Sequence, residues 1–325
     1  MLVISEAQVK DLLDLDELIA ALEQAHIQFS AGRVVMPVRL VVPLPEIQGR
    51  ITSMPAFMSE GKALGIKIIS YFRDNPQQGL PPILATIALY SAETGKIEVL
   101  MDGVYITAIR TACASAMATK ALARAETPVL GILGAGTQAR THIRALSRVR
   151  SIERVLIWSP SRVNAVYVKE ELEDELGFPI QPQESAEAVV RGADILTAVT
   201  DAAEPILDAG WLKPGVHINA VGSHRPEARE MGGDTVKRST VVVDSLDAIH
   251  SECGDILLAL KEGAVAPDHV RGEIGEVLAG AKPGRTSDDE ITMYKSVGIA
   301  AQDVAAASLV YRRARERGVG TEVEI

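Results

Sequence analysis

Short apolar runs recur through the middle of the chain, and polar segments of helix length separate them. The first run, Val129–Leu133, is suited to a strand that is buried on both faces, as the strands of parallel sheets are. Further strands are predicted at Arg154–Trp158, 194–200, 216–221 and Thr240–Val243, with helices at 165–175 and 184–190. Strands that alternate with helices in this way predict a doubly wound parallel sheet and therefore an α/β fold.

The first hundred residues follow a different pattern. Ser5 opens a capping-box signature, and Asp14 precedes a second helix. Five strands are then predicted, at 34–42, 50–55, 64–72, Ile83–Tyr90 and 97–101. Arg39, Arg50 and Lys67 each lie within one of these strands, where a single cation normally points toward solvent. These elements predict a mixed sheet with helices, separate from the parallel sheet that follows.

A glycine-rich sequence, GAGTQA, follows the strand Val129–Leu133 without a gap. In this GxGxxA pattern, Gly134 and Gly136 allow a tight turn and a close approach of the backbone to a pyrophosphate. The small Ala139 permits close packing of the next helix, whose N-terminal N–H groups face the anion. Because Arg154–Trp158 completes the strand–helix–strand unit that the fingerprint requires, a dinucleotide site is favoured over a glycine-rich turn of an ordinary α/β protein.

Two helices flank this segment. One begins at Thr107, is rich in small residues and carries Arg110 in its first turn. The other covers 296–317 and lies beyond the nucleotide unit, so we expect it to return to the first domain. We therefore assign residues 1–120 plus 296–325 to a mixed α+β domain, and residues 121–295 to a Rossmann-type NAD(P)-binding domain.

The end of the second Rossmann strand distinguishes between the two nicotinamide cofactors. An NAD site usually has an acid there for the ribose 2′-OH, whereas an NADP site replaces it with an arginine. Here Trp158 is followed by Ser159, Pro160, Ser161 and Arg162, with no acid. NADP(H) is therefore favoured. The alternative is that Ser161 only caps the next helix and Arg162 is solvated, which would leave a site that also accepts NAD(H).

The composition narrows the range of partners. The 325 residues, 47% of them hydrophobic, are enough for two domains. The net charge of −10, without a basic patch, argues against a nucleic-acid or membrane partner. Cys113 and Cys253 lie far apart, so we expect free thiols and no metal site. Because the first residues lack the basic region and apolar core of a signal peptide, we expect a cytoplasmic protein.

Several longer motifs are more specific than the glycine fingerprint. They are MPVR, SMPAF, DGVYITAIRTACASA, LGILGAGTQA, GADILTAVT, KPGVHINAVGSHRPEARE and KSVGIAAQD. Through them the whole chain resembles the ornithine cyclodeaminase/μ-crystallin family, and within it the μ-crystallin branch associated with NADPH-dependent ketimine reduction. The resemblance implies a homodimer whose first domain, completed by the C-terminal helix, supplies the substrate pocket and the subunit contact.

The resemblance also implies roles for individual residues. Arg39 and Arg110 match the arginines that hold the substrate carboxylate, which agrees with the bidentate grip of a guanidinium. Lys67 matches the active-site lysine, beside the carboxylate and the reacting nitrogen. The implied cofactor contacts are Thr86, Gly134, Ala135, Gly136, Thr137, Gln138, Thr200, Val221, Gly222 and Ser296, to which the sequence adds Ser159, Ser161 and Arg162.

One position departs from the cyclodeaminases. They carry an aspartate directly after the Val-Gly of the turn that follows the fifth strand, or one residue further. In this chain the Val-Gly is Val221-Gly222, and Ser223 and His224 come after it. Without that carboxylate, cyclodeamination of ornithine is less favoured. His224 is a candidate catalytic proton donor, because an imidazole titrates near neutrality, or it only shapes the mouth of the pocket.

The sequence therefore predicts a reductase of small 2-imino acids that forms an L-amino acid. The favoured substrates are cyclic ketimines such as pyrroline-2-carboxylate or piperideine-2-carboxylate. Two alternatives stay open. One is another enzyme of the family, either an ornithine or lysine cyclodeaminase or an alanine-type dehydrogenase. The other is a non-catalytic NADPH-dependent binding protein.

Overall fold

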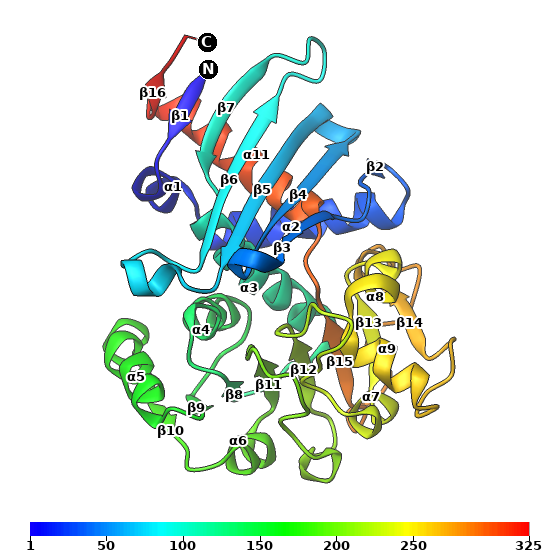
Figure 1. Ribbon diagram of the computed structural model, residues 1–325. Helices are drawn as coiled ribbons and strands as arrows, with labels where there is room; N and C mark the ends of the chain where they lie inside the picture. Colours follow the sequence, from blue (N-terminus) through cyan, green and yellow to red (C-terminus); the bar gives the residue numbers. More distant parts are fainter. Residues whose placement is uncertain (325) are drawn as a thin grey trace. The chain divides into compact units, whose positions relative to one another are not determined.

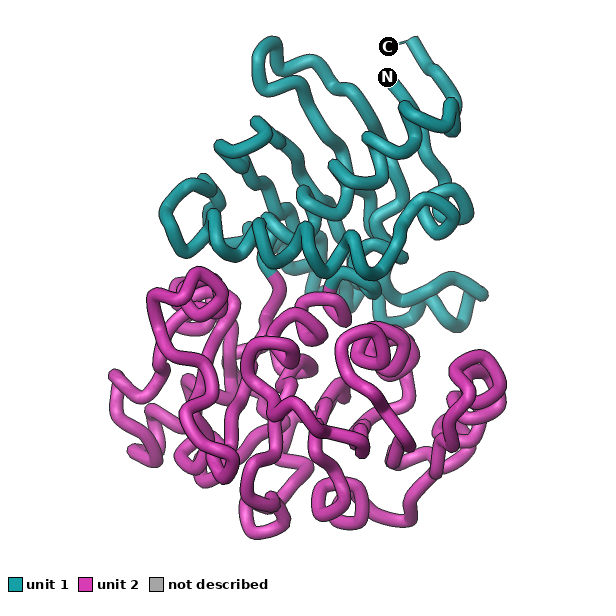
Figure 2. Tube along the Cα trace, turned by 180° about the vertical axis from the view of Figure 1, so that it is seen from behind, with its two compact units in different colours: residues 1–110, 299–325 teal, residues 111–298 magenta. Residues whose placement is uncertain are grey.

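The computed structural model describes residues 1–324, which form two compact units (Figure 2). Unit 1 combines residues 1–110 with the C-terminal segment from Ile299, and unit 2 contains residues 111–298. The units thus divide at Arg110 and Gly298, where the sequence suggested 120 and 295. Among the described residues, no helix is both long and apolar enough to cross a membrane.

Unit 1 is built on an eight-stranded sheet with the order β16-β1-β7-β6-β5-β4-β2, in which β3 also pairs with β4. The β1–β7 pair is parallel, and the other pairs are antiparallel. The strands are β1 (Leu2–Ile4), β2 (Val34–Val35), β3 (Leu40–Leu44), β4 (Gly49–Met58), β5 (Ala63–Phe72), β6 (Ile83–Tyr90), β7 (Ile97–Asp102) and β16 (Thr321–Glu322). The helices are α1 (Glu6–Leu12), α2 (Leu15–Ser30), the first part of α3 (Val104–Leu122) and α11 (Ala300–Arg317).

One face of this sheet is covered by α11, which runs behind β4, β5 and β6 in Figure 1 and also packs on α2. Alternate residues of the three strands point to this face, and Lys67 lies there between Met54 and Ile87. All three side chains are buried. Gly65 allows α11 to come close, because a Cβ at this position would lie 3.1 Å from Val304. Lys67 therefore points into the core, and the expectation that a strand cation faces solvent is wrong here.

The predicted strand at 34–42 is in fact two short strands. β2 ends at Val35 and β3 begins at Leu40, and both pair along the same edge of β4. Pro37 lies in the gap, and proline has no N–H to donate to the ladder. Arg39 consequently lies in the interruption just before β3, and not within a strand.

Helix α3 begins earlier than the sequence indicated. The carboxylate of Asp102 accepts the backbone N–H groups of Val104 (3.1 Å) and Tyr105 (3.2 Å), so it caps the helix at Val104 and not at Thr107. As a result, Arg110 lies in the second turn.

Unit 2 has the predicted parallel sheet, in the order β10-β9-β8-β11-β12-β15-β13-β14, and every pair in it is parallel. The first six strands in this order have the arrangement of the classic dinucleotide-binding fold, with β15 in the sixth place. The strands are β8 (Val129–Leu133), β9 (Arg154–Trp158), β10 (Ile180–Pro182), β11 (Ile195–Ala198), β12 (His217–Ala220), β13 (Thr240–Val243), β14 (Val270–Glu273) and β15 (Thr292–Lys295). The helices are α4 (Thr137–Val149), α5 (Arg162–Leu176), α6 (Ala186–Gly192), α7 (Gly233–Arg238), α8 (Leu246–Glu252), α9 (Gly254–Lys261) and α10 (Ile274–Leu278).

The α/β fold class is thus confirmed, but β13 is not the last strand. β14 and β15 follow it in the chain, and β15 lies between β12 and β13 in the sheet. β10 was also not predicted. Their sequences, IQP, VRGE and TMYK, are short and carry polar residues, so periodicity alone did not distinguish them from loops.

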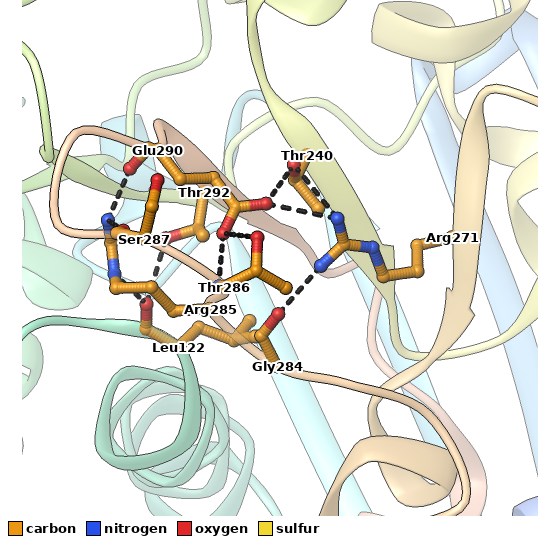
Figure 3. Close-up of polar contacts among 9 residues, drawn as sticks. All are labelled: Leu122, Thr240, Arg271, Gly284, Arg285, Thr286, Ser287, Glu290 and Thr292. Atoms are coloured by element: carbon orange, nitrogen blue, oxygen red, sulfur yellow. Dashed lines mark hydrogen bonds and ion pairs between the residues drawn. The ribbon is translucent and has the colours of Figure 1, made fainter.

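A polar network fastens the loop before β15 to the end of α3 (Figure 3). The guanidinium of Arg285 donates to the backbone oxygen of Leu122 (2.9 Å) at the C-terminus of α3 and to the Thr292 hydroxyl (2.9 Å). Glu290 accepts from the hydroxyl of Thr240 (2.6 Å) and from Arg271 (3.0 Å). Because the cation of Arg285 lies at a helix C-terminus, it also interacts favourably with the helix dipole.

Glu290 is expected to make the stability of the protein sensitive to acid. Burial works to raise its pKa, but its hydrogen bonds to Thr240 and Thr286 and the charge of Arg271 outweigh this and lower the pKa to about 2. Since the folded pKa is below the ordinary value of 4.5, the carboxylate stabilises the fold above about pH 4.5, and this contribution is lost as the pH falls toward 2. Glu290→Gln should therefore lower the free energy of unfolding by about 1–3 kcal/mol at pH 7, and by less at pH 3.5.

Urea unfolding at both pH values measures the effect, with Asp289→Asn in the same loop as an exposed control. An equal loss at the two pH values would contradict the role of the Glu290 charge.

Candidate active site

Unit 1 contains a buried cluster of charges on the face covered by α11. The Nζ of Lys67 lies 2.7 Å from one carboxylate oxygen of Asp303, and the Nε of Arg110 donates to the other at 2.9 Å. The side chains of Lys67 and Asp303 are 1% and 0% exposed, so this ion pair is removed from water. Three distant segments, β5, α3 and α11, supply the three residues. The structure thus brings two predicted site residues, Lys67 and Arg110, onto one shared carboxylate.

The cluster extends toward α2 through Gln302. The Nη1 of Arg110 donates to the amide oxygen of Gln302 at 2.7 Å, and the amide nitrogen lies 2.9 Å from Nε2 of His26. Because a guanidinium only donates, the amide oxygen must face Arg110, and the amide N–H is then directed to His26. His26 must accept at Nε2 and is neutral. Burial, with the charge of Arg110, lowers the pKa of His26 to about 3.

The charges in this cluster do not balance. Burial favours the neutral amine of Lys67, and the charges of Arg110 and Arg39 act in the same direction. Asp303 opposes them, and the resulting pKa of Lys67 is about 7. Burial works to raise the pKa of Asp303, but Arg110 and Lys67 outweigh it and lower the pKa. Asp303 is therefore ionised, while Lys67 exchanges its proton near neutral pH.

In unit 2, the glycine loop lies at the carboxyl end of β8. The sheet order reverses direction between β8 and β11, and dinucleotides bind at such a switch point. Gly134 has φ of 112°, and a Cβ there would lie 2.8 Å from the backbone oxygen of Val199. A Cβ on Gly136 would meet nothing within 4 Å among the described residues. The loop is thus open where a pyrophosphate would approach, at the N-terminus of α4, and its residues fit this group.

Arg140 holds this loop from the helix side. Its Nη1 donates to the backbone oxygens of Ala135 (2.9 Å) and Gly136 (3.2 Å), while its Nε pairs with Glu171 at 2.6 Å. Thr137 is exposed, and Gln138 is half-buried. Sequence analysis did not single out Arg140, because an arginine on a helix reads as a solvated residue.

The other predicted cofactor residues of unit 2 follow the ends of strands. Thr200 follows β11, Val221 and Gly222 follow β12, and Ser296 follows β15. Ser296 is buried, and its hydroxyl donates to Asp244 at 3.0 Å. The same oxygen of Asp244 accepts the backbone N–H groups of Val297 and Gly298, so Asp244 fixes the segment that leads out of unit 2.

The residues after β9 have a partner that sequence analysis did not foresee. Arg162 forms an ion pair with Glu184, which follows β10, and both side chains are exposed. Ser161 precedes α5, but within the described chain its hydroxyl makes no capping hydrogen bond. Ser159 is half-buried.

Two further predicted residues are exposed. Thr86 is exposed on β6, and because it precedes Ile87, it points to the sheet face opposite Lys67. His224 is exposed, with Nδ1 3.1 Å from the backbone oxygen of Gly222. A carbonyl oxygen only accepts, so Nδ1 carries the hydrogen.

Asp303, Asp244 and Glu230 are the acids that sequence analysis missed. Each is fully buried and holds segments that contain predicted site residues. For Asp303, the available signal was an acid within the small-residue side of a long helix, where a solvated charge is out of place.

The fold and the two sites define a dinucleotide-binding protein of the oxidoreductase class, with a cationic cluster suited to a small carboxylate. The chain belongs to the ornithine cyclodeaminase/mu-crystallin family, whose pattern matches residues 1–318. The resemblance read from the sequence motifs is thereby confirmed.

Individual relatives match over the whole length. A Δ1-pyrroline-2-carboxylate reductase of Bacillus cereus is 36% identical over 325 residues, which is 100% of both chains. The solved structure of Thermococcus litoralis Δ1-pyrroline-2-carboxylate reductase, in complex with NADH and L-proline, superposes with a TM-score of 0.97 at 40% identity, covering 99% of this chain and 100% of that one. An archaeal alanine dehydrogenase dimer with bound NAD has a TM-score of 0.94 at 34% identity, with 100% and 99% covered.

Proposed function

We propose that this protein is an NAD(P)H-dependent ketimine reductase that converts a small cyclic 2-imino acid, such as pyrroline-2-carboxylate or piperideine-2-carboxylate, into an L-amino acid. The observation that carries the proposal is the charge imbalance of the buried cluster. The single carboxylate of Asp303 is shared by Lys67 and Arg110, and the charge of Arg39 also acts on Lys67. A substrate carboxylate would supply the second negative charge. The whole-length similarity to pyrroline-2-carboxylate reductases supports the same substrate class.

Arg110 and Arg39 would bind that carboxylate. Arg110 uses Nε and Nη1 for Asp303 and Gln302, and a guanidinium has five N–H donors in all. Its orientation is fixed by these two bonds before any substrate arrives, so little conformational entropy is lost on binding. When bound, the nicotinamide supplies the hydride that reduces the carbon of the C=N bond.

Lys67 would keep the imine nitrogen protonated. Its pKa of about 7 places the amine and ammonium forms in comparable amounts at neutral pH. An arriving carboxylate favours the ammonium form, because an opposite charge nearby raises the pKa of an amine. Binding of the substrate therefore favours the ammonium form of Lys67, and its Nζ donates a proton toward the imine nitrogen. His224 is the second candidate for this role.

Purified protein offered both cyclic ketimines, with NADPH or NADH, tests the proposal by the loss of nicotinamide absorbance. Pyruvate with ammonia serves as the comparison for an alanine-type dehydrogenase, and ammonia release from ornithine or lysine for a cyclodeaminase. Rapid oxidation with a ketimine supports the proposal and excludes a purely binding protein. No oxidation with either ketimine would overturn it.

NADP(H) is the cofactor favoured by the residues that follow β9. The pair of Arg162 with Glu184 is exposed, and exposed pairs contribute little stability. A 2′-phosphate would compete with Glu184 for the guanidinium. NAD(H) stays possible because Ser159 and Ser161 can bind a ribose hydroxyl.

Arg162→Gln is accordingly expected to raise the KM for NADPH by about 10–100-fold, the cost of a lost charge-assisted hydrogen bond. The KM for NADH should change little. Glu184→Gln should have the opposite effect and lower the KM for NADPH, because it removes the competing carboxylate. Steady-state kinetics with both cofactors measure the two variants. Equal changes for NADPH and NADH would contradict a contact with the 2′-phosphate.

A homodimer is supported by the apolar surface of unit 1. Large hydrophobic side chains are exposed on and beside β2, β3 and β6, and a second chain would cover them. They are Val35, Val38, Leu40, Val41, Val42, Leu80, Ile83 and Leu84.

A further inference from the structure

A buried carboxylate joins the two loops that follow β11 and β12. The first oxygen of Glu230 accepts the backbone N–H of Thr200 at 2.6 Å and its hydroxyl at 2.7 Å. The second oxygen accepts the backbone N–H of Gly222 at 2.7 Å. Glu230 is 0% exposed, although it lies in a loop. One side chain thus occupies both backbone donors at the carboxyl ends of these strands.

The fit between the two loops is close. A Cβ on Gly222 would lie 2.1 Å from the backbone oxygen of Thr200 and 2.6 Å from the carboxyl carbon of Glu230, so only glycine fits at this position. The Glu230 carboxylate and the Thr200 and Gly222 loops are thus packed directly against one another.

Glu230 is itself held at its backbone. Its N–H donates to Asp255 of α9 at 2.8 Å, and its oxygen accepts from Ile206 at 3.0 Å. Asp255 pairs with Lys295 of β15 at 2.9 Å, and the Nζ of Lys295 donates to the backbone oxygen of Ser223 at 2.7 Å. The network connects the ends of three neighbouring strands, β11, β12 and β15.

The charges around Glu230 make its ionisation sensitive to pH. Burial raises its pKa to about 7, and Asp255 acts in the same direction, while the hydrogen bonds from Thr200 and the charge of Lys295 lower it. The Cys253 thiol beside Lys295 stays neutral, because burial raises its pKa to about 12. Protonation of Glu230 would place an O–H donor against the N–H of Thr200 or Gly222. One of these N–H groups would then lose its hydrogen-bond acceptor, and the link between the two loops would be weakened.

We propose that Glu230 is a positioning residue for the dinucleotide, whose ionised carboxylate holds the Thr200 and Gly222 loops in the geometry that receives the nicotinamide half. The proposal rests on the proposed function, because it requires that the protein binds NAD(P)(H) at the carboxyl ends of these strands. Glu230 need not touch the cofactor. It acts through Thr200 and Gly222, and cofactor affinity falls when the carboxylate is protonated.

The test is a titration of the protein, residues 1–325, with NADH, followed by nicotinamide fluorescence between pH 5.5 and 8.5. NADH is used because a 2′-phosphate titrates near pH 6 and would add its own pH dependence. For the unmodified protein, the Kd should rise as the pH falls through about 7. Glu230→Gln should raise the Kd about tenfold at pH 8 and abolish the pH dependence. The exposed Glu262→Gln serves as the control and should behave as the unmodified protein.

Each outcome bears on one proposal. Unmodified protein that binds neither NADH nor NADPH at any pH would overturn the proposed function. Binding that is strong but independent of pH would overturn the role of Glu230 ionisation, whether or not Glu230→Gln folds. A pH dependence that persists in Glu230→Gln would overturn it as well.

Discussion

Replacing Lys67 with methionine is expected to lower kcat for a cyclic ketimine by about 10²–10⁴-fold, the usual contribution of a positioned general acid. Methionine keeps the apolar stem in the core and removes only the proton donor. Asp303 retains Arg110 as its partner at 2.9 Å, so no buried carboxylate is left without a cation. The glycine loop belongs to unit 2, and the Kd for NADPH should therefore be unchanged.

Stopped-flow measurement of the first turnover, together with a fluorescence titration of NADPH, separates these two quantities. If turnover is retained while binding is normal, Lys67 is not the donor, and His224 is the next residue to replace.

Asp303→Asn should have the largest effect on stability and should also change the pH profile. Removing one partner of a buried ion pair typically costs about 3–5 kcal/mol, and here two buried cations share the carboxylate. In the folded variant, the pKa of Lys67 should fall below about 7, because Asp303 is the group that raises it. Because Lys67 must be protonated to act as the acid, kcat/KM falls at high pH as Lys67 loses its proton. This fall, the basic limb of the pH profile, must then move to lower pH.

Urea unfolding and a pH series of kcat/KM measure the two effects, with Glu316→Gln at an exposed position of the same helix as the control. A purely structural role for Asp303 would lower stability and leave the position of the basic limb unchanged.

Much of unit 2 could be predicted from the sequence, because parallel strands are continuous apolar runs and the glycine loop requires a fixed local geometry. Val129–Leu133 and Arg154–Trp158 lie where they were predicted. β15 was not predicted, because Thr292–Lys295 is buried by its neighbours and not marked by an apolar pattern of its own. The break at Pro37 is visible in the sequence, because proline has no N–H to donate to the strand ladder.

The site was predicted unevenly. Arg39, Lys67 and Arg110 lie within motifs and could be named from the sequence, but Asp303, the carboxylate that Lys67 and Arg110 share, could not. Asp303 can be buried because it pairs with cations that are distant in the sequence, and Arg110, for example, lies 193 positions before it. No local sequence pattern indicates such a pairing. Glu230 raises the same difficulty, since an acid in a loop is ordinarily solvated.

The discontinuity of unit 1 bears on how the chain folds during synthesis. Strand β1 pairs with β16, and Lys67 meets its counter-ion only on α11, so the first hundred residues leave the ribosome long before their partners exist. Unit 2 is continuous in sequence, so it can fold before the C-terminal elements of unit 1 have been synthesised. The exposed apolar strands of unit 1 are then the part of the nascent chain that a chaperone would have to protect, and a chain truncated before α11 would have two buried cations and no anion to hold them.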